Sequence, residues 1–165
     1  MSNKFPDKKI AGPSRRDMIR LAGLAGLAGS VTPLAMRPAY ATAEAMQEAI
    51  RKVVGEATVT PGKVKLEIPP LVENGNTVPC EVTVESPMTP TDHVQAIYVF
   101  CEKNPQPNAF AARLGPRAGR PAIATRIRLA DTQTVIAIAE LSDGTFWSDS
   151  TDVIITLGAC LEDLI

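Results

Sequence analysis

Apolar and polar residues alternate over most of the chain after residue 62. In the segment 76–86, apolar side chains fall at every second position: Val78, Cys80, Val82 and Val84. This period is typical of a β-strand with one buried face. Seven segments show strand character: 63–68, 76–86, 94–103, 109–114, 121–130, 133–141 and 145–157. Turn signals such as Asn74-Gly75-Asn76 separate them, and the spacing predicts an all-β fold, an immunoglobulin-like β-sandwich of about seven strands.

The segment before these strands has the spacing of a helix instead. Met46, Ile50, Val53 and Val54 recur on one face of residues 44–54, and Gly55 follows as a stop signal. The sequence therefore predicts one N-terminal helix ahead of the sandwich, in a domain that spans residues 42–157.

Two of the predicted strands are apolar on both faces. Segment 94–101 has Val94, Ala96, Tyr98 and Phe100 on one face and Ile97, Val99 and Cys101 on the other. Segment 135–141 has Ile136 and Ile138 opposite Val135, Ala137, Ala139 and Leu141. We expect the two strands to be neighbours in one sheet, with one face in the core. The other face then needs a cover, either the predicted helix or a second protein chain.

The first 41 residues differ in charge from the rest of the chain. They hold seven basic and two acidic residues, a net charge of +5, whereas residues 42–165 hold ten basic and sixteen acidic residues, a net charge of −6. Arg15 and Arg16 precede a mildly apolar run, and Ala39-Tyr40-Ala41 has the small-x-small pattern of a cleavage site. These features predict a bacterial twin-arginine signal peptide over 1–41 and a periplasmic mature chain. A membrane anchor would need about 20 strongly apolar residues, so we expect no membrane segment in the mature chain.

Composition limits the chemistry of the mature domain. The formal net charge of −1 and the single histidine, His93, give no support for nucleic-acid binding or a histidine-based metal site. The sequence shows no phosphate-binding loop, nucleophile elbow or metal-ligand spacing, and we expect no cofactor. We interpret Trp147 as core or hairpin packing. The arginines between residues 113 and 128 are interpreted as a solvated face: Arg113, Arg117, Arg120, Arg126 and Arg128.

Three cysteines remain as candidate reactive groups. Alternating strand directions would place Cys80, Cys101 and Cys160 at the same end of the sandwich. In an oxidising compartment Cys80 and Cys101 are the candidate disulfide pair, and the alternative is two buried thiols that act as small apolar residues. Cys160 lies in the tail 158–165, where an exposed thiolate would be nucleophilic. The alternative for Cys160 is a chance cysteine in a fraying end.

Several strings of residues are similar to those of a known bacterial family. They are Glu73-Asn-Gly-Asn-Thr-Val-Pro79, Glu85-Ser-Pro-Met-Thr89, Phe100-Cys-Glu-Lys-Asn-Pro105, Thr125-Arg-Ile-Arg-Leu-Ala130, Thr132-Gln-Thr134 and Ser142-Asp-Gly-Thr-Phe-Trp147. In combination and in this order, they resemble the SoxY family, the sulfur-carrier subunit of bacterial thiosulfate oxidation. The twin-arginine leader matches this family too.

The resemblance implies a carrier protein and not an enzyme. Such a carrier holds thiosulfate-derived sulfur covalently on a cysteine while enzymes of the SoxAX, SoxB and SoxCD type load, oxidise and release it. The resemblance also implies a SoxZ-like partner chain, exported together with the carrier as a heterodimer. Cys160 matches the carrier cysteine, and Gly158 matches one glycine of the Gly-Gly-Cys-Gly-Gly arm that surrounds it in the family.

The segment around Cys160 departs from the family pattern. Ala159 replaces one glycine, and Leu161-Glu162-Asp163-Leu164-Ile165 replaces the glycines that follow. Bulk and negative charge beside the sulfur would hinder access and disfavour the thiolate. Two alternatives to the carrier therefore stay open: a SoxY-like structural or binding subunit with a non-carrier arm, and a thiol-redox module that uses all three cysteines.

Overall fold

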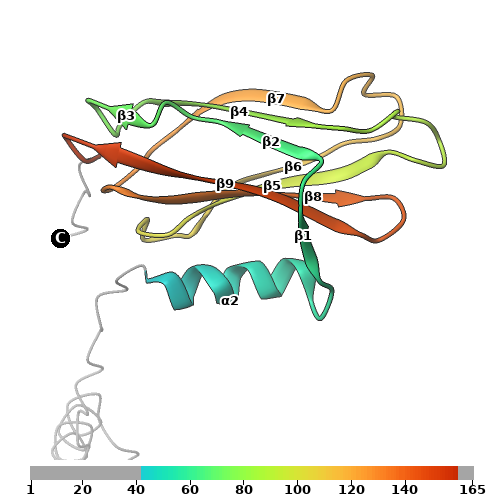
Figure 1. Ribbon diagram of the computed structural model, residues 1–165, viewed down its shortest axis with the longest axis horizontal. Coiled ribbons are helices and arrows are strands. Elements are labelled where there is room, and N and C mark those ends of the chain that lie inside the picture. The colour runs from blue at the N-terminus through green and yellow to red at the C-terminus, as the bar shows by residue number, and fades with distance from the viewer. Residues whose placement is uncertain (1–41, 160–165) are drawn as a thin grey trace, which may run out of the picture. The chain divides into compact units, whose positions relative to one another are not determined.

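Three layers make up the part of the chain that the computed structural model describes, residues 42–159 (Figure 1). A three-stranded sheet packs on a six-stranded sheet, and the helix α2 (Ala43–Val54) lies along the outer side of the larger sheet. The predicted immunoglobulin-like β-sandwich with one N-terminal helix is confirmed. The predicted signal peptide, residues 1–41, lies outside the described residues.

The strands of the larger sheet follow one another in the order β1 (Val59–Pro61), β9 (Phe146–Ile155), β8 (Gln133–Leu141), β5 (Val94–Cys101) and β6 (Asn108–Arg113), and β3 (Leu71–Val72) also pairs with β9. The smaller sheet has the order β2 (Val64–Glu67), β4 (Val78–Val84) and β7 (Ala122–Ile127). All seven predicted segments form strands. The sequence does not predict β1 and β3, because strands of three and two residues are too short to show alternation.

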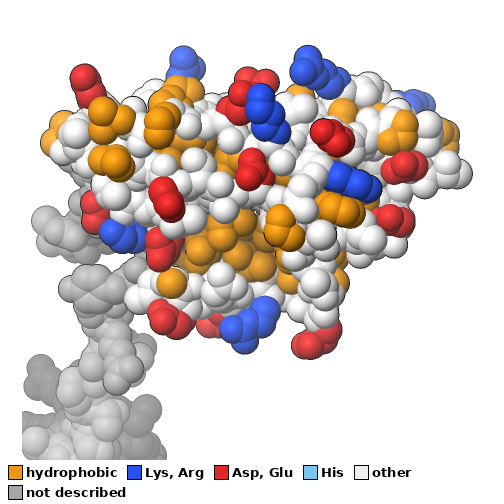
Figure 2. Space-filling model, in the orientation of Figure 1, with side chains coloured by type: hydrophobic (Ala, Val, Ile, Leu, Met, Phe, Trp, Pro, Cys, Tyr) orange, Lys and Arg blue, Asp and Glu red, His pale blue; other side chains and the backbone are white. Residues whose placement is uncertain are grey.

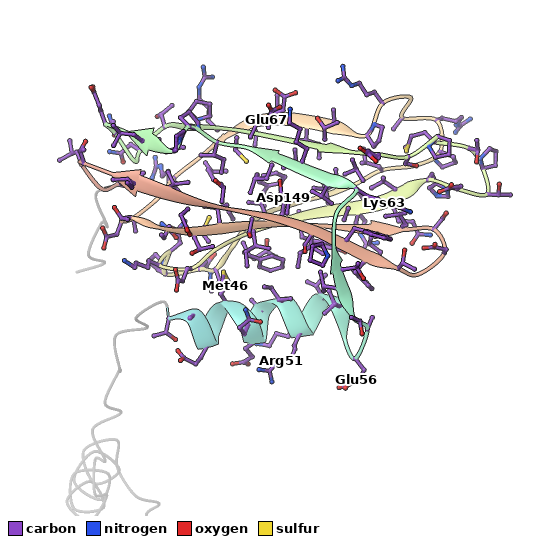
Figure 3. The ribbon with its side chains drawn as sticks, viewed as in Figure 1. Met46, Arg51, Glu56, Lys63, Glu67 and Asp149 are labelled. Carbon is purple, nitrogen blue, oxygen red and sulfur yellow. The ribbon has the colours of Figure 1, made fainter. Side chains whose placement is uncertain are left out.

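The helix covers the outer face of the larger sheet. Thr42 caps its start by accepting a hydrogen bond from the Ala45 N–H (3.3 Å), and Gly55, with φ of 63°, ends it. Figure 3 shows Met46 pointing toward the sheet and Arg51 pointing away from it. Buried residues of the helix and the sheet form one apolar cluster: Met46, Ile50, Val54, Ala96, Tyr98, Phe100, Ile138 and Phe146. Of the two expected covers, the helix is therefore the one that the structure provides.

The main core lies between the two sheets. The strands β5 and β8, which are apolar on both faces, are neighbours, as predicted. One predicted face of β8 packs in the core between the two sheets, and the other packs in the apolar cluster under the helix. One assignment is wrong: Val94 packs in the main core and not on the helix side. The pairing of β5 with β8 shifts register between Val94 and Ala96, and this irregularity reverses the direction of Val94 relative to the simple alternation.

The two long sides of the sandwich differ. On the side of β2 and β9, the Asp149 carboxylate accepts a hydrogen bond from the Leu66 N–H at 2.8 Å and joins the two sheets (Figure 3). On the other side, the edge strands β6 and β7 flank an open groove of about 440 Å³. Figure 2 shows charged side chains of both signs over the surface and hydrophobic side chains gathered where the helix layer meets the sheet.

Candidate functional site

The two cysteines within the described residues lie in the core between the sheets. Cys80 is on β4 and Cys101 ends β5, and their exposed fractions are 1% and 0%. Both belong to the same apolar cluster, so Cys101 faces inward, a point that the two-sided sequence pattern leaves open. Cys160, the predicted carrier residue, lies outside the described residues.

Cys80 and Cys101 are both free thiols in the structure. Burial raises the pKa of Cys80 to about 11. Burial, with a smaller effect from the neighbouring Cys80, raises the pKa of Cys101 to about 12. As free thiols in the core, Cys80 and Cys101 each fill the volume of a small apolar side chain. A thiol-redox module would need a thiolate at one of these positions, and burial opposes its formation.

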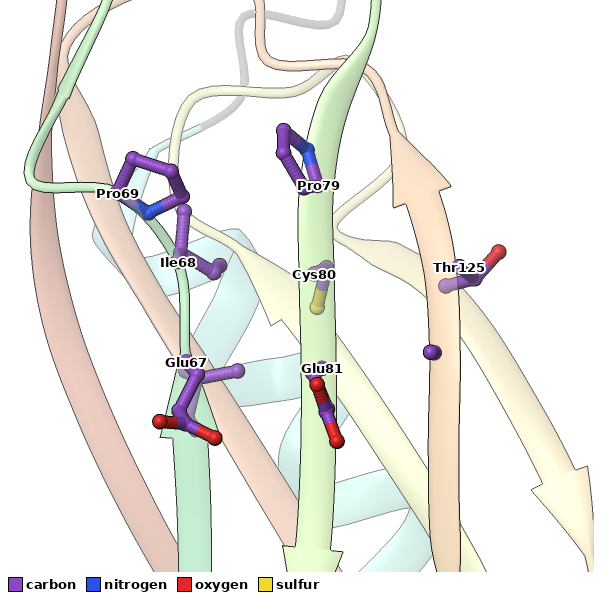
Figure 4. Close-up of a pocket in the computed structure, with 9 residues that line it drawn as sticks. Glu67, Ile68, Pro69, Pro79, Cys80, Glu81 and Thr125 are labelled. Atoms are coloured by element: carbon purple, nitrogen blue, oxygen red, sulfur yellow. The ribbon is translucent and has the colours of Figure 1, made fainter.

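A shallow pocket lies on the outer side of the smaller sheet, above Cys80 (Figure 4). It has a volume of about 570 Å³, and Glu67, Pro79, Glu81 and Thr125 contribute to its walls. Two carboxylates and no basic side chain are among its lining residues, so the pocket does not attract an oxyanion. Cys80 also lines the pocket, but only 1% of its surface is exposed, so the pocket offers no accessible thiol.

After β9, backbone hydrogen bonds hold the chain up to the residue before Cys160. The Leu157 carbonyl accepts from the Gly75 N–H at 2.8 Å, and the Ala159 N–H donates to the Leu129 carbonyl at 3.0 Å. The Leu129 N–H in turn donates to the Gly75 carbonyl at 2.8 Å. Three segments, 74–76, 128–131 and 156–159, therefore meet at one place, which we call the exit corner.

Two glycines let the backbones of the exit corner approach one another. A Cβ atom on Gly158 would overlap the carbonyl oxygen of Ala130, and a Cβ atom on Gly75 would overlap that of Leu129. A side chain at either position would therefore push the segments apart. The resemblance implies only that Gly158 belongs to the carrier arm, and the structure shows in addition that it lies in close contact with Ala130. The sequence does not single out Gly75, because Asn74-Gly75-Asn76 shows a turn but not the segment across from it.

Asn104 ties the exit corner to the body of the domain. Its Nδ2 donates to the Arg128 carbonyl at 2.7 Å, and its Oδ1 accepts from the Ala130 N–H at 3.0 Å. The same Oδ1 accepts from Nε2 of Gln133 at 3.1 Å, and Gln133 is itself buried. These bonds fix the segment 128–131 against the loop between β5 and β6.

The other sequence candidates lie apart from the exit corner or carry no site chemistry. The five arginines of 113–128 are exposed, and none forms an ion pair within the described residues. Trp147 packs against the main core, with the Lys63 ammonium 4.5 Å from its ring centre. Residues 42–159 contain no group of three or more His, Cys, Asp or Glu side chains able to hold a metal ion. Over the same residues, no helix has the length and hydropathy needed to cross a membrane.

Comparisons with known proteins agree on the fold. The structure of the sulfur carrier protein SoxY from Chlorobium limicola f thiosulfatophilum is similar, with a TM-score of 0.59 and 22% identity over 70% of this chain and 100% of that one. A superoxide reductase (neelaredoxin) from Ignicoccus hospitalis has a TM-score of 0.52 and 15% identity over 57% of this chain and 80% of that one. At these identities the likeness shows a shared fold alone.

Sequence comparison identifies the family. No curated protein sequence matches the chain. Residues 50–160, however, match the family described as "Sulfur oxidation protein SoxY", and the matched range ends on Cys160. Because the match spans well over half of the sequence and includes the strands and the exit corner, this chain belongs to the SoxY family.

Proposed function

We propose that this chain is a periplasmic sulfur carrier that holds thiosulfate-derived intermediates covalently on Cys160. Its family supports a role in sulfur oxidation and a carrier role in place of catalysis. A protein that shares its fold is a sulfur carrier by name. Both comparisons support the role in general, and the assignment to Cys160 depends on the cysteines of this chain.

The position of the other two cysteines carries the assignment. Cys80 and Cys101 are buried, and burial raises the pKa of both thiols. A carrier thiol must instead be reachable by other proteins and able to form a thiolate. Cys160 is the remaining cysteine of the sequence, and the family match extends to it.

The chemistry of loading explains why a carrier needs separate enzymes. Joining the Cys160 sulfur to the outer sulfur of thiosulfate forms one S–S bond, releases the thiol proton and removes two electrons. An oxidoreductase with its own electron acceptor must therefore load the carrier. Enzymes of the SoxAX, SoxB and SoxCD type are the expected partners for loading, release and oxidation.

The location and the partner chain are further parts of the proposal. Arg15, Arg16 and the small-residue cleavage site before Thr42 support export by the twin-arginine route. Family membership supports a SoxZ-like partner. The two-sided apolar sheet does not add to this support, since α2 covers its outer face.

The test is complementation of cells from which the native gene has been deleted. We expect the wild-type chain to restore thiosulfate consumption and Cys160→Ser to abolish it, with equal amounts of each protein in the periplasm. Cys80→Ala is the matched control, because it removes a thiol that fills core volume and should retain activity if the protein accumulates. Restored consumption by Cys160→Ser would contradict the carrier assignment and favour a structural subunit.

A further inference from the structure

Backbone hydrogen bonds hold the last residues before Cys160, which a freely moving arm would not have. We propose that the exit corner is an anchor that sets the position of the carrier cysteine, with Gly75 and Gly158 as positioning residues. The inference deepens the proposed function and rests on it, since the thiol being positioned is that of Cys160. Sulfur is then presented to the enzymes at one corner of the sandwich.

The backbone hydrogen bonds of the exit corner extend to Ala159, the residue directly before Cys160. The chain is bonded as far as Ala159, whose N–H donates to the Leu129 carbonyl at 3.0 Å. Without the exit corner it would be held only as far as Thr156, whose N–H donates to the Val72 carbonyl at 3.1 Å. Release of residues 157–159 would add about 10 Å of reach, at about 3.3–3.6 Å per extended residue. The anchor therefore shortens the distance that Cys160 can travel and gives it a defined position.

Close packing, and not backbone conformation, explains the two glycines. Neither Gly75 nor Gly158 has a positive φ, the backbone state in which glycine is usually required. In both, the space for a Cβ atom is filled by a carbonyl oxygen of the segment 128–131. Gly115 shows the contrast, because a Cβ atom there would meet nothing within 4 Å. The exit corner thus depends on the absence of a side chain at two positions that are distant in the sequence.

A polar network holds the other side of the anchor in place. Asn104 bonds to the backbone at Arg128 and Ala130, and the buried Gln133 bonds to Asn104. Four of the strings that resemble the SoxY family contribute to this arrangement: 73–79, 100–105, 125–130 and 132–134. These four segments are separate in the sequence and meet at the exit corner, directly before Cys160. We expect this arrangement of residues that position the cysteine.

A distance distribution between two spin labels tests the anchor. One label is placed on Cys160 and the other on an introduced Glu81→Cys, which is exposed on the central strand of the smaller sheet. Because Cys80 and Cys101 are buried, we expect neither to take label in the folded protein. The full-length chain is compared with Gly158→Ala, with Ala159→Pro, which lacks the donating N–H, and with the control Gly115→Ala.

We expect a narrow distribution for the parent and for Gly115→Ala, and a distribution broadened by up to about 10 Å for the two anchor variants. Near-ultraviolet circular dichroism of Trp147 and the protection of Cys80 and Cys101 verify the fold. Ala159→Pro removes a single hydrogen bond beyond the last strand, so it remains informative if Gly158→Ala folds poorly. A parent distribution as broad as those of the anchor variants would overturn the anchor.

Thiosulfate consumption in complemented cells tests whether the position matters. We expect Gly158→Ala to lower it by about tenfold or more, because misplaced reacting groups slow transfer, while Gly115→Ala leaves it unchanged. Unchanged consumption with a broadened distribution would overturn the positioning role. The two proposals fail separately: a Cys160→Ser variant that still supports thiosulfate oxidation refutes the carrier, and equal label distributions refute the anchor alone.

Discussion

The three thiols should differ in reactivity by orders of magnitude, and the difference can be worked out from their surroundings. At about pH 8, a cysteine with the ordinary pKa of 9.0 is about one tenth thiolate, whereas Cys80, with a pKa of about 11, is about one thousandth. Cys101, with a pKa of about 12, is about one ten-thousandth thiolate. Because the thiolate is the attacking species, these fractions lower the reactivity of Cys80 and Cys101 by up to about 100-fold and 1,000-fold relative to an exposed cysteine. The greater nucleophilicity of a thiolate of high pKa offsets part of this difference, and burial adds to it by blocking access of the reagent.

The assay is the reaction of the folded protein with an aromatic disulfide reagent, followed by absorbance. We expect one fast thiol in the parent chain, no fast thiol in Cys160→Ser, and three thiols in the parent after unfolding in denaturant. Cys80→Ala is the control and should keep its fast thiol. A second fast thiol in the folded parent, or a fast thiol that persists in Cys160→Ser, would refute the placement of the reactive groups.

Three further predictions concern stability. Ile50→Ala should lower the free energy of unfolding by about 2–4 kcal/mol, because Ile50 is buried between α2 and the larger sheet; Gln47→Ala, on the exposed side, should change it by less than about 0.5 kcal/mol in urea unfolding. Asp149→Ala should lower it by about 1–2 kcal/mol, because the Leu66 N–H loses its acceptor; a change within error would contradict the joining role of Asp149. Above pH 9.0 the unfolded chain releases thiol protons that Cys101 retains up to about pH 12. The stability that each buried cysteine contributes should therefore be fully present below pH 9.0. Between pH 9.0 and the pKa of that cysteine in the folded chain, the free energy of unfolding should fall by up to about 1.4 kcal/mol per pH unit for each buried cysteine. If the free energy of unfolding of Cys101→Ala fell equally steeply with pH, this cause would be contradicted.

Much of the fold could be predicted because local periodicity reflects which face is buried. The alternation in β4 and β8 and the apolar stripe of the helix each describe a face that meets the core. The direction of Val94 could not be predicted, because a register irregularity breaks the period of two. The parallel pairing of β1 and β3 with β9 could not be predicted either, because it joins segments that are far apart in the sequence.

The candidate site was less predictable, since it depends on contacts between distant segments. Alternation indicated an inward Cys80, but Cys101 sits on a strand that is apolar on both faces, so its direction could not be inferred. Spacing cannot show which carbonyl lies across from a glycine, so the close contact of Gly158 with Ala130 could not be predicted. Gly75 gave only the signal of a turn.

The most direct test of the carrier is mass spectrometry of the chain recovered, without reductant, from the periplasm of cells exposed to thiosulfate. We predict a mature chain that begins at Thr42, sulfur or sulfonate increments on the peptide that contains Cys160, and unmodified thiols at Cys80 and Cys101. An unmodified Cys160, or a disulfide from Cys160 to Cys80 or Cys101, would contradict the account.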